Sequence, residues 1–163
     1  MKYHIRKVEE KDRRELTDII NYYIENSYAA YRETKVGTEL FDGLLALAKG
    51  FPFYVAETED HQTVGFGLLH LYHGAETFTR TAEITYFISQ EHTHAGIGRA
   101  FLDTLTSDAR NIGIDTILAS ISSLNEQSLR FHEKYGFVEC GRFRRIGRKW
   151  GKDFDMVWMQ KFI

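Results

Sequence analysis

The sequence predicts one domain of the α/β (α+β) class, in which helices flank a mixed, mostly antiparallel central sheet. Three observations support this prediction. The chain has 163 residues, about the length of one domain, so we expect a single domain over residues 1–163. Its 43% hydrophobic and 27% charged residues are ordinary for a globular protein. Segments of strand and helix character alternate in the middle of the chain, which favours this class over a β-sandwich.

The first third of the chain predicts a strand followed by two helices. Residues 2–7 have the composition of a strand. Apolar residues then recur at the i, i+3, i+4, i+7, i+8 spacing of an amphipathic helix: Leu16, Ile19, Ile20, Tyr23 and Ile24. A second helix is expected over residues 38–49, because Gly50 follows as a stop signal.

Three strands are expected next. Residues 53–57 and 64–72 are rich in apolar and aromatic residues, and the polar segment 58–63 separates them. Because a connection this short joins neighbouring strands, we expect them to pair antiparallel. Residues 80–89 predict a third strand.

The second half of the chain alternates helices with strands. The predicted elements are a helix over 96–112, a strand over 116–122, a helix over 125–135, and closing strands over 138–146 and 153–162. The first of these helices carries one apolar side, made of Phe101, Leu102, Leu105, Ala109 and Ile112. Residues 116–122 are almost continuously apolar, as expected of a strand covered on both faces. Gly136 suits the end of the second helix.

Charge and hydropathy exclude several classes of protein. Lys plus Arg total 21 against 23 for Asp plus Glu, a net charge of -2. This balance predicts no general attraction to nucleic acid or to an anionic membrane. The longest apolar run, residues 44–48, is far shorter than the ~20 residues that a membrane span needs. We therefore expect neither nucleic acid nor a membrane as a partner.

One local segment is basic, and it has two interpretations. Either it is a solvated hairpin near the end of the chain, or it is a rim that binds phosphate or carboxylate. Its members are Arg142, Arg144, Arg145, Arg148, Lys149 and Lys152.

The single cysteine, Cys140, excludes an intrachain disulfide and suits a reducing compartment. We expect its thiol to be buried and inert. Residues 1–16 are rich in charge and lack the apolar segment of a secretion signal. Both observations predict a cytoplasmic protein.

Residues 93–100 form a glycine-containing segment between a predicted strand and a predicted helix. Gly96 and Gly98 let a ligand approach the backbone closely, and the helix N-terminus offers free amides. Such a junction can bind phosphate or pyrophosphate. A P-loop is excluded because no Gly-Lys-Ser/Thr ends the segment. A dinucleotide fingerprint fits poorly because Phe101 holds its third glycine position. A tight turn without a ligand remains the alternative.

Glu83 is the most informative carboxylate. Strand alternation puts it on one face with Thr85 and Phe87, while its neighbours Ala82 and Ile84 are apolar. It is either solvated at the edge of the sheet or enclosed in a pocket. In a pocket, desolvation would raise its pKa toward the range of a general base.

The predicted helix 125–135 contributes two further candidates. Asn125 suits an N-cap. His132 follows Ser128 by four residues and falls on the inward face of the helix. There it is either a hydrogen-bonded core histidine or a proton donor or acceptor near neutral pH.

We expect no metal site. His92 and His94 form a His-x-His pair, and His70 and His73 lie upstream. No carboxylate or cysteine cluster completes a set at ligand spacing.

Taken together, these segments resemble the GNAT superfamily of acyl-CoA-dependent N-acetyltransferases, and within it the phosphinothricin acetyltransferase branch. The resemblance runs from Ile5-Arg6 to Asp155 and covers nearly the whole chain. Residues 93–98 correspond to the superfamily motif Gln/Arg-x-x-Gly-x-Gly/Ala, with Thr93 in place of the usual Gln or Arg. The pattern Asn-x6-His-x4-Phe follows at the right distance, from Asn125 to Phe137.

The resemblance implies acetyl-CoA as the cosubstrate, no metal, and direct acetyl transfer to an amine. Glu83 matches the general base of the branch. His132 stands where many relatives have a tyrosine acid, so it would protonate the CoA thiolate or assist with the amine. The implied cofactor-binding residues are Phe87, Ile88, Thr93, His94, Ala95, Gly96, Ile97, Gly98, Arg99 and Asn125.

The acceptor implied by the resemblance is the primary amine of a small, amino-acid-like molecule of the phosphinothricin or methionine sulfone type. Tyr31, Arg32, His73 and Phe78 match pocket-lining positions, and Arg32 could pair with a carboxylate. His73 and Ala75 stand where phosphinothricin relatives have a lysine and an arginine, so phosphinothricin itself is a poor fit. A general small amine or a polyamine remains an alternative acceptor. Relatives of this branch are often homodimers. The alternatives are a non-catalytic acyl-CoA-binding sensor module and an interaction domain without CoA.

Overall fold

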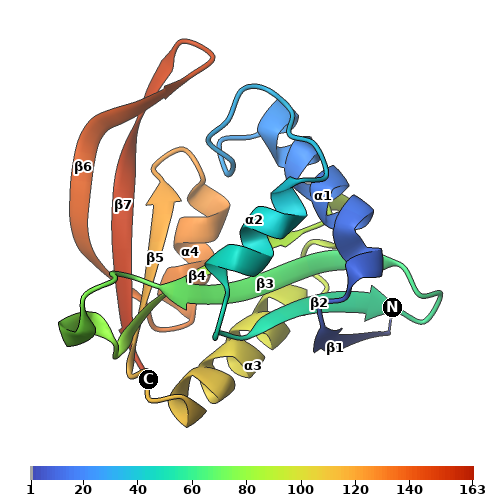
Figure 1. Cartoon of the computed structure of the whole chain (residues 1–163). Helices are drawn as coiled ribbons and strands as arrows, with labels where there is room; N and C mark the ends of the chain where they lie inside the picture. Colours follow the sequence, from blue (N-terminus) through green and yellow to red (C-terminus); the bar gives the residue numbers. More distant parts are fainter. Residues whose placement is uncertain (1) are drawn as a thin grey trace.

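A seven-stranded sheet organises residues 2–163, which the computed structural model describes (Figure 1). The strands are β1 (Tyr3–Lys7), β2 (Phe53–Thr58), β3 (Thr63–Leu71), β4 (Thr81–Ile88), β5 (Thr116–Ser122), β6 (Val138–Lys149) and β7 (Lys152–Phe162). Their spatial order is β1-β2-β3-β4-β5-β7-β6. Within this sheet β4 and β5 pair parallel, and the other neighbouring pairs are antiparallel. The predicted fold class is confirmed.

Helices cover the two faces of the sheet and create two cores. The helices are α1 (Arg13–Asn26), α2 (Leu40–Leu47), α3 (Ile97–Asn111) and α4 (Glu126–Lys134), with short 3₁₀ helices at Glu10–Asp12, Glu76–Phe78 and Gln90–His92. Helices α1 and α2 pack with Val55 and Phe66 on one face. Helix α3 packs with Ile84 and Ile117 on the other face. Because strand residues alternate between faces, one strand such as β4 supplies both cores.

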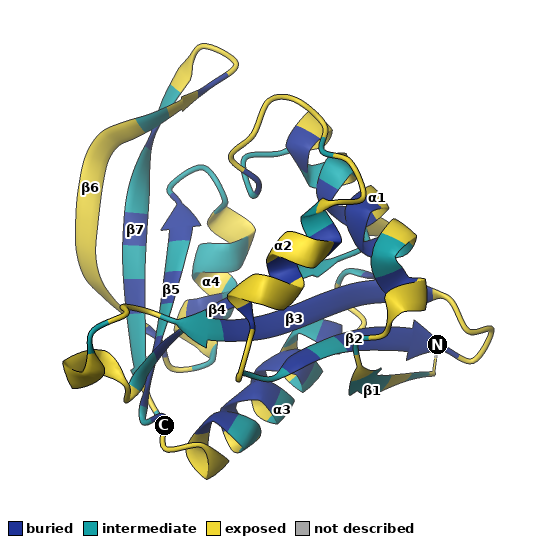
Figure 2. Ribbon diagram, in the orientation of Figure 1, coloured by how far each residue is buried: buried dark blue, intermediate teal, exposed yellow. Residues whose placement is uncertain are grey.

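Most predicted elements end within three residues of the observed ones, and two details of burial differ. Cys140 is exposed, so the prediction of a buried thiol is wrong. It lies on β6, one of the two edge strands, which is exposed along most of its length (Figure 2). Ile112 is 48% exposed because α3 ends at Asn111, one residue before it. Gly136 follows α4 with φ +89, as the sequence predicted for its end.

The sheet opens between β4 and β5. These strands pair over three residues, Thr81–Glu83 on β4 with Thr116–Leu118 on β5. Beyond that point β4 stays paired with β3 as far as Ile88, and β5 stays paired with β7 as far as Ser122. The facing edges of β4 and β5 therefore leave room for a ligand in the middle of the sheet.

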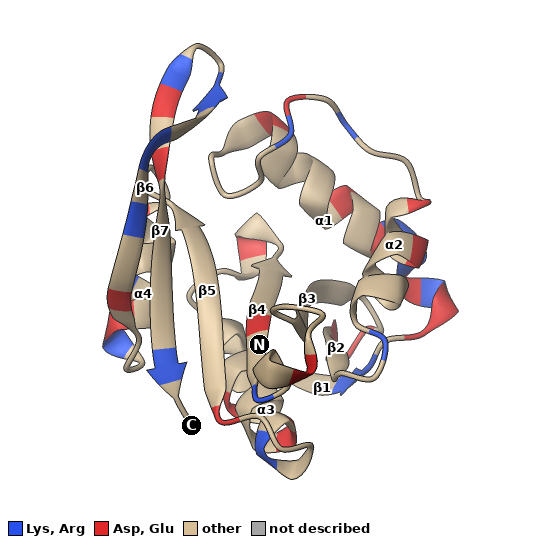
Figure 3. Cartoon of the chain, turned by 60° about the vertical axis from the view of Figure 1, so that its left-hand side comes forward, with Lys and Arg blue, Asp and Glu red and all other residues tan. Residues whose placement is uncertain are grey.

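The basic segment forms the far part of the β6–β7 hairpin (Figure 3). Three of its four arginines form ion pairs on the surface. Arg142 contacts Glu139 and Asp155, and both Arg145 and Arg148 contact Asp153. This pairing fits the solvated hairpin. Lys149 is an exception because it is fully buried.

No helix within residues 2–163 combines the length and the hydropathy that a membrane crossing requires.

Candidate active site

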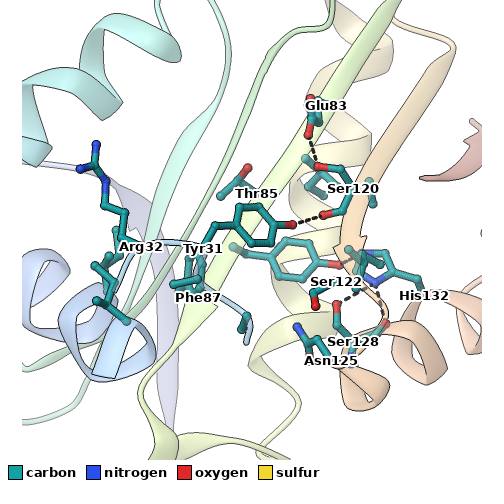
Figure 4. Close-up of a pocket in the computed structure, with 18 of the residues that line it drawn as sticks. Tyr31, Arg32, Glu83, Thr85, Phe87, Ser120, Ser122, Asn125, Ser128 and His132 are labelled. Carbon is teal, nitrogen blue, oxygen red and sulfur yellow. Dashed lines mark hydrogen bonds between the residues drawn. The ribbon is translucent and has the colours of Figure 1, made fainter. Parts of the chain in front are cut away.

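A cavity of about 470 Å³ lies where β4 and β5 separate, on the side of the sheet that α1 and α2 cover (Figure 4). We name it the Glu83 cavity. Its polar lining comes from distant parts of the chain: Tyr31, Arg32, Glu83, Thr85, Ser120 and Ser122. Helix α4 supplies Ser128 and His132. Of the two sequence interpretations of Glu83, the structure has the one in which the carboxylate lines a pocket.

The Glu83 carboxylate has close neighbours on both adjacent strands. Ser120 Oγ on β5 donates a hydrogen bond to Glu83 Oε1 at 2.7 Å. On β3, His70 is the direct partner of Glu83 in the strand register, and its Nε2 lies 3.8 Å from Glu83 Oε2. The Glu83 side chain is 18% exposed. A half-buried carboxylate with one fixed oxygen can receive a proton from a ligand in the cavity.

Tyr31 and Arg32 reach the cavity from the loop that follows α1. The Tyr31 ring stacks on Phe154 of β7 at a centroid distance of 5.8 Å. Its hydroxyl donates to the Ser120 carbonyl oxygen at 3.2 Å, as Figure 4 shows. Burial, with a contribution from the charge of Glu83, raises the pKa of Tyr31 to about 12. The phenol therefore stays neutral, and Arg32 is the cation of this lining.

His132 is buried under the cavity with both ring nitrogens occupied. Its Nδ1 lies 2.7 Å from the Ser128 carbonyl oxygen, so Nδ1 carries the proton and donates it. Its Nε2 then accepts a hydrogen bond from the Tyr86 hydroxyl at 2.5 Å. Burial lowers the pKa of His132 to about 4, and burial also raises the pKa of Tyr86. At neutral pH His132 is uncharged and fixes the position of the Tyr86 hydroxyl.

A second cavity, of about 520 Å³, lies at the N-terminus of α3. We name it the glycine-loop cavity. The backbone before α3 turns sharply, with φ +64 at His94 and φ +85 at Gly96. Left-handed residues beside a helix start direct several amides into one concave surface. The first amides of α3 also lack partners within the helix, and its dipole favours an anion there.

Gly98 shows why the loop needs a small residue. A Cβ atom at this position would lie 3.3 Å from the Phe131 ring of α4. The absence of a side chain allows α4 to approach α3 closely and leaves the cavity open between them. These features fit a phosphate-bearing ligand, and the alternative of a turn without a ligand is less consistent with the open cavity.

The two cavities share part of their lining and so lie next to each other. Tyr86, Phe87 and Asn125 line both of them. Asn125 is the N-cap of α4, as predicted, and its Oδ1 accepts a hydrogen bond from the Ser128 amide at 3.3 Å. A ligand held at the glycine loop can therefore meet a second ligand held beside Glu83.

Most of the predicted cofactor-binding residues line the glycine-loop cavity: Phe87, Ile88, Thr93, His94, Gly96, Gly98, Arg99 and Asn125. Two do not. The Ala95 side chain is exposed, and Ile97 is buried in the core with 2% exposure. Their amides still belong to the loop.

Sequence reasoning missed Arg130 and Lys134, two cations of α4 that line the same cavity. Their four-residue spacing on a helix facing the glycine loop is the signal that could have found them. It also missed Tyr23 of α1, whose hydroxyl donates to the Ile88 carbonyl oxygen at 2.6 Å and fixes the end of β4.

Two predicted acceptor residues are not brought into the site. His73 and Phe78 belong to the connection between β3 and β4, and in the described chain they are not among the residues that line the Glu83 cavity. Their rings contact each other at a centroid distance of 4.7 Å and both pack near Tyr72. This connection contains the 3₁₀ helix Glu76–Phe78, and its residue Phe78 packs back against His73.

Within residues 2–163, no three His, Cys, Asp or Glu side chains are arranged to hold a metal ion.

Comparisons with known proteins agree with this geometry. Residues 5–158 match the model of the acetyltransferase (GNAT) domain family. The chain is similar to the L-methionine sulfoximine/L-methionine sulfone acetyltransferase of Salmonella typhimurium. The two are 28% identical over 161 residues, which cover 96% of this chain and 92% of that protein.

Two solved structures are similar over almost the whole chain. A ribosomal-protein-alanine N-acetyltransferase from Brucella melitensis is 33% identical, with a TM-score of 0.90 over 98% of this chain and 99% of that chain. A phosphinothricin acetyltransferase from Sinorhizobium meliloti in complex with acetyl-CoA is 25% identical, with a TM-score of 0.93 over 100% of this chain and 89% of that chain. Because the family model covers most of the sequence, this protein belongs to the GNAT family and is an acetyl-CoA-dependent acetyltransferase.

Proposed function

We propose that the protein transfers the acetyl group of acetyl-CoA to the amine of a small, amino-acid-like molecule. The observation that carries this proposal is the shared wall of the two cavities. A cavity with helix-terminal amides and cations lies directly beside a cavity that holds a carboxylate, and Tyr86, Phe87 and Asn125 line both. The similar protein of Salmonella typhimurium is named for amino-acid acceptors, which supports the same class here.

Acetyl-CoA is assigned to the glycine-loop cavity. The amides of residues 93–99 and the N-terminal end of α3 suit the pyrophosphate. Arg99, Arg130 and Lys134 supply positive charge around it. Phe87 and Ile88 at the end of β4 would offer backbone groups to the pantetheine arm and the thioester carbonyl, and Asn125 would contact the cosubstrate from α4. Thr93 lines the cavity although it replaces the usual Gln or Arg.

The acceptor is assigned to the Glu83 cavity. Glu83 takes a proton from the acceptor ammonium, directly or through a water molecule, and so creates the neutral amine that attacks the thioester. Arg32 pairs with the acceptor carboxylate and Tyr31 forms the adjacent wall. His73 and Phe78 are not part of this proposal because they lie outside the cavity lining.

The reaction needs no covalent enzyme intermediate. The amine nitrogen bonds to the acetyl carbon, the C–S bond breaks, and its electron pair leaves with sulfur. The ammonium loses two protons in all: Glu83 takes the first, and the second balances the proton that the CoA thiolate gains. His132 contributes by orienting the Tyr86 hydroxyl where the two cavities meet, since its own N–H is bonded to Ser128.

Release of free CoA tests this function. The purified protein is mixed with acetyl-CoA and one amine, and new thiol is measured; the amines are L-methionine sulfone, phosphinothricin and a peptide that begins with alanine. We expect the first to be acetylated fastest. In the described chain, the lining of the Glu83 cavity contains one arginine, Arg32, and no lysine, so with Arg32 on the acceptor carboxylate the anionic phosphinate would have no cationic partner. A preference for the peptide would instead favour the acceptor named for the Brucella melitensis protein.

A melting experiment separates an enzyme from a non-catalytic sensor. Acetyl-CoA at ~100 times its dissociation constant should add about 2.7 kcal/mol of stability. For a domain of this size, that corresponds to a rise of roughly 5–10 °C in the melting temperature. A sensor would show the rise and release no thiol with any amine. An interaction domain without CoA would show neither.

We also propose that the chain is a cytoplasmic homodimer. Strand β6 is an unpaired sheet edge that carries exposed Val138, Phe143 and Ile146, and such an edge favours association with a second copy. The exposed free thiol of Cys140 suits a reducing compartment. Sedimentation should give twice the monomer mass of 19.0 kDa, and Phe143→Lys should lower it. Cell fractionation tests the location.

A further inference from the structure

Lys149 is a buried lysine at the end of β6, and the reaction outlined above does not use it. Its side chain has no exposed surface. Its ammonium donates to three backbone carbonyl oxygens, those of Ile24 at 2.7 Å, Ser27 at 2.6 Å and Ala30 at 2.8 Å. An ammonium group has three N–H donors. Each donor therefore has its own carbonyl acceptor.

The three carbonyls belong to the end of α1 and to the loop that follows it. The last carbonyls of a helix lack partners within the helix and carry partial negative charge, which a cation stabilises. Lys149 thus connects the tip of the β6–β7 hairpin to a segment about 120 residues earlier in the chain. Ala30, the third acceptor, directly precedes Tyr31 and Arg32 of the Glu83 cavity.

Neighbouring contacts strengthen the same connection. The Trp150 ring lies 4.3 Å from the Lys149 ammonium and packs edge-on against Tyr28 at 5.2 Å. The Trp150 amide donates to the Glu33 carboxylate. The contacts of Trp150 with Tyr28 and Glu33 join the hairpin tip to residues 27–36, which we name the acceptor loop.

The acceptor loop is also fixed at its other end. The Asn21 side chain of α1 forms two hydrogen bonds with the backbone of Val36, at 2.9 and 3.0 Å. Tyr31 and Arg32 lie between these two attachments. Their positions at the cavity wall therefore depend on both, although neither Lys149 nor Asn21 lines the cavity in the described chain.

We propose that Lys149 is a positioning residue for the acceptor: it holds the acceptor loop so that Tyr31 and Arg32 form the wall against which the amine substrate binds. This inference rests on the proposed function, in which the acceptor occupies the Glu83 cavity. It predicts that damage at the hairpin tip weakens acceptor binding and leaves the acetyl-CoA side intact.

The test compares Lys149→Met with Lys152→Met. Both remove one positive charge from the same hairpin tip. Lys152 is exposed, and in the described chain its contact with the acceptor loop is a distant one, 5.9 Å from its Nζ to the Tyr28 ring, in place of the three carbonyl hydrogen bonds of Lys149. With L-methionine sulfone as acceptor, Lys149→Met should raise the acceptor KM by about tenfold, equivalent to about 1.4 kcal/mol of binding. The KM for acetyl-CoA should stay within about twofold, and Lys152→Met should change neither constant. Equal changes in both KM values, or no change in a folded Lys149→Met, would overturn the proposal.

Two further measurements keep the proposal testable if Lys149→Met does not fold. Trp150→Ala removes a ring that is 47% exposed and keeps the ammonium; it should raise the acceptor KM less than Lys149→Met and leave the KM for acetyl-CoA unchanged. Amide hydrogen exchange on Trp150→Ala should be faster in residues 27–36 than in the wild type and unchanged in residues 93–98. If the wild-type protein acetylates no amine, the proposed function fails, while the exchange experiment still shows whether the hairpin tip holds the loop. Unchanged exchange in the acceptor loop would show that the hairpin tip does not hold this loop, and it would overturn the proposal.

Discussion

The two cavities of this protein are built in different ways. The anion-binding part of the glycine-loop cavity consists of backbone amides of one continuous stretch, residues 93–99, although β4 and α4 complete the cavity wall. The Glu83 cavity uses side chains from separate segments, with Tyr31, Glu83 and Ser120 coming from a loop and two strands. A site made of contiguous backbone is fixed by local geometry. A site made of distant side chains depends on how the whole chain packs.

This difference predicts that mutations can impair acetyl-CoA binding and acceptor binding independently. Changes at Glu83 should leave acetyl-CoA binding intact, and changes at the glycine loop should leave acceptor binding intact. His132 lies below their junction, so a change there should affect the stability of both sides together.

The largest effect is expected from Glu83→Gln. This change keeps the size of the side chain and its contact with Ser120 but removes the base, so turnover should fall by ~10²–10⁴-fold. The thermal shift caused by acetyl-CoA should be unchanged. Glu76→Gln, an exposed residue outside the cavity, is the control and should keep full turnover. Unchanged turnover of Glu83→Gln at saturating amine would remove Glu83 from this role.

The second effect concerns His132 and the pH dependence of stability. Its folded-state pKa of about 4 lies below the ordinary value of 6.5. Between these values the unfolded chain binds more protons than the folded one, so stability falls as pH is lowered. The stabilisation of the fold by neutral His132 is fully present above pH 6.5, and about 3 kcal/mol of it should be lost by pH 4.

Urea unfolding at several pH values measures this loss. The His132→Gln variant should lack the loss of stability that protonation of His132 causes. The difference in stability between wild type and variant should therefore shrink as pH falls. His73→Gln, at an exposed histidine, should follow the wild type. A difference between wild type and His132→Gln that is constant over this pH range would show that His132 is not kept neutral by burial.

The smallest effect is expected from Gly96→Ala. Gly96 has φ +85, so an alanine there costs roughly 1–2 kcal/mol and strains the backbone that orients the loop amides. We expect the KM for acetyl-CoA to rise by about tenfold and the acceptor KM to stay unchanged. Gly113→Ala is a matched control, because Gly113 has φ +86 and nothing within 4 Å. Both variants should lose similar stability; a similar loss of acetyl-CoA affinity in both would contradict a role for the loop.

Much of the fold could be predicted because its signals are local. The helix pattern at Leu16–Ile24 and the apolar run of β5 each reflect one element and its own period. The end of β6 could not be predicted, since residues 147–149 carry no alternating pattern and are extended by pairing with β7. Cys140 was expected inside, and only the place of β6 at the sheet edge explains its exposure.

The candidate site shows the same division. The amides at Gly96 and Gly98 and the cap at Asn125 follow from residue type and spacing within a few positions. The position of His73 and Phe78 outside the cavity does not follow from residue type and spacing, because it depends on how the connection between β3 and β4 packs. The burial of Lys149 does not either, since a lysine in a basic segment is normally solvated.

By itself the sequence determined the fold class, the order of the elements, the glycine loop and the residues that carry the family resemblance. Tertiary structure decided where β4 and β5 separate, that Ser120 holds Glu83, that His132 binds Tyr86, and that Lys149 reaches the end of α1. The physical reason is the distance along the chain over which each effect acts. Local periodicity and backbone preference act over a few residues, whereas these contacts join groups 37 to 125 positions apart.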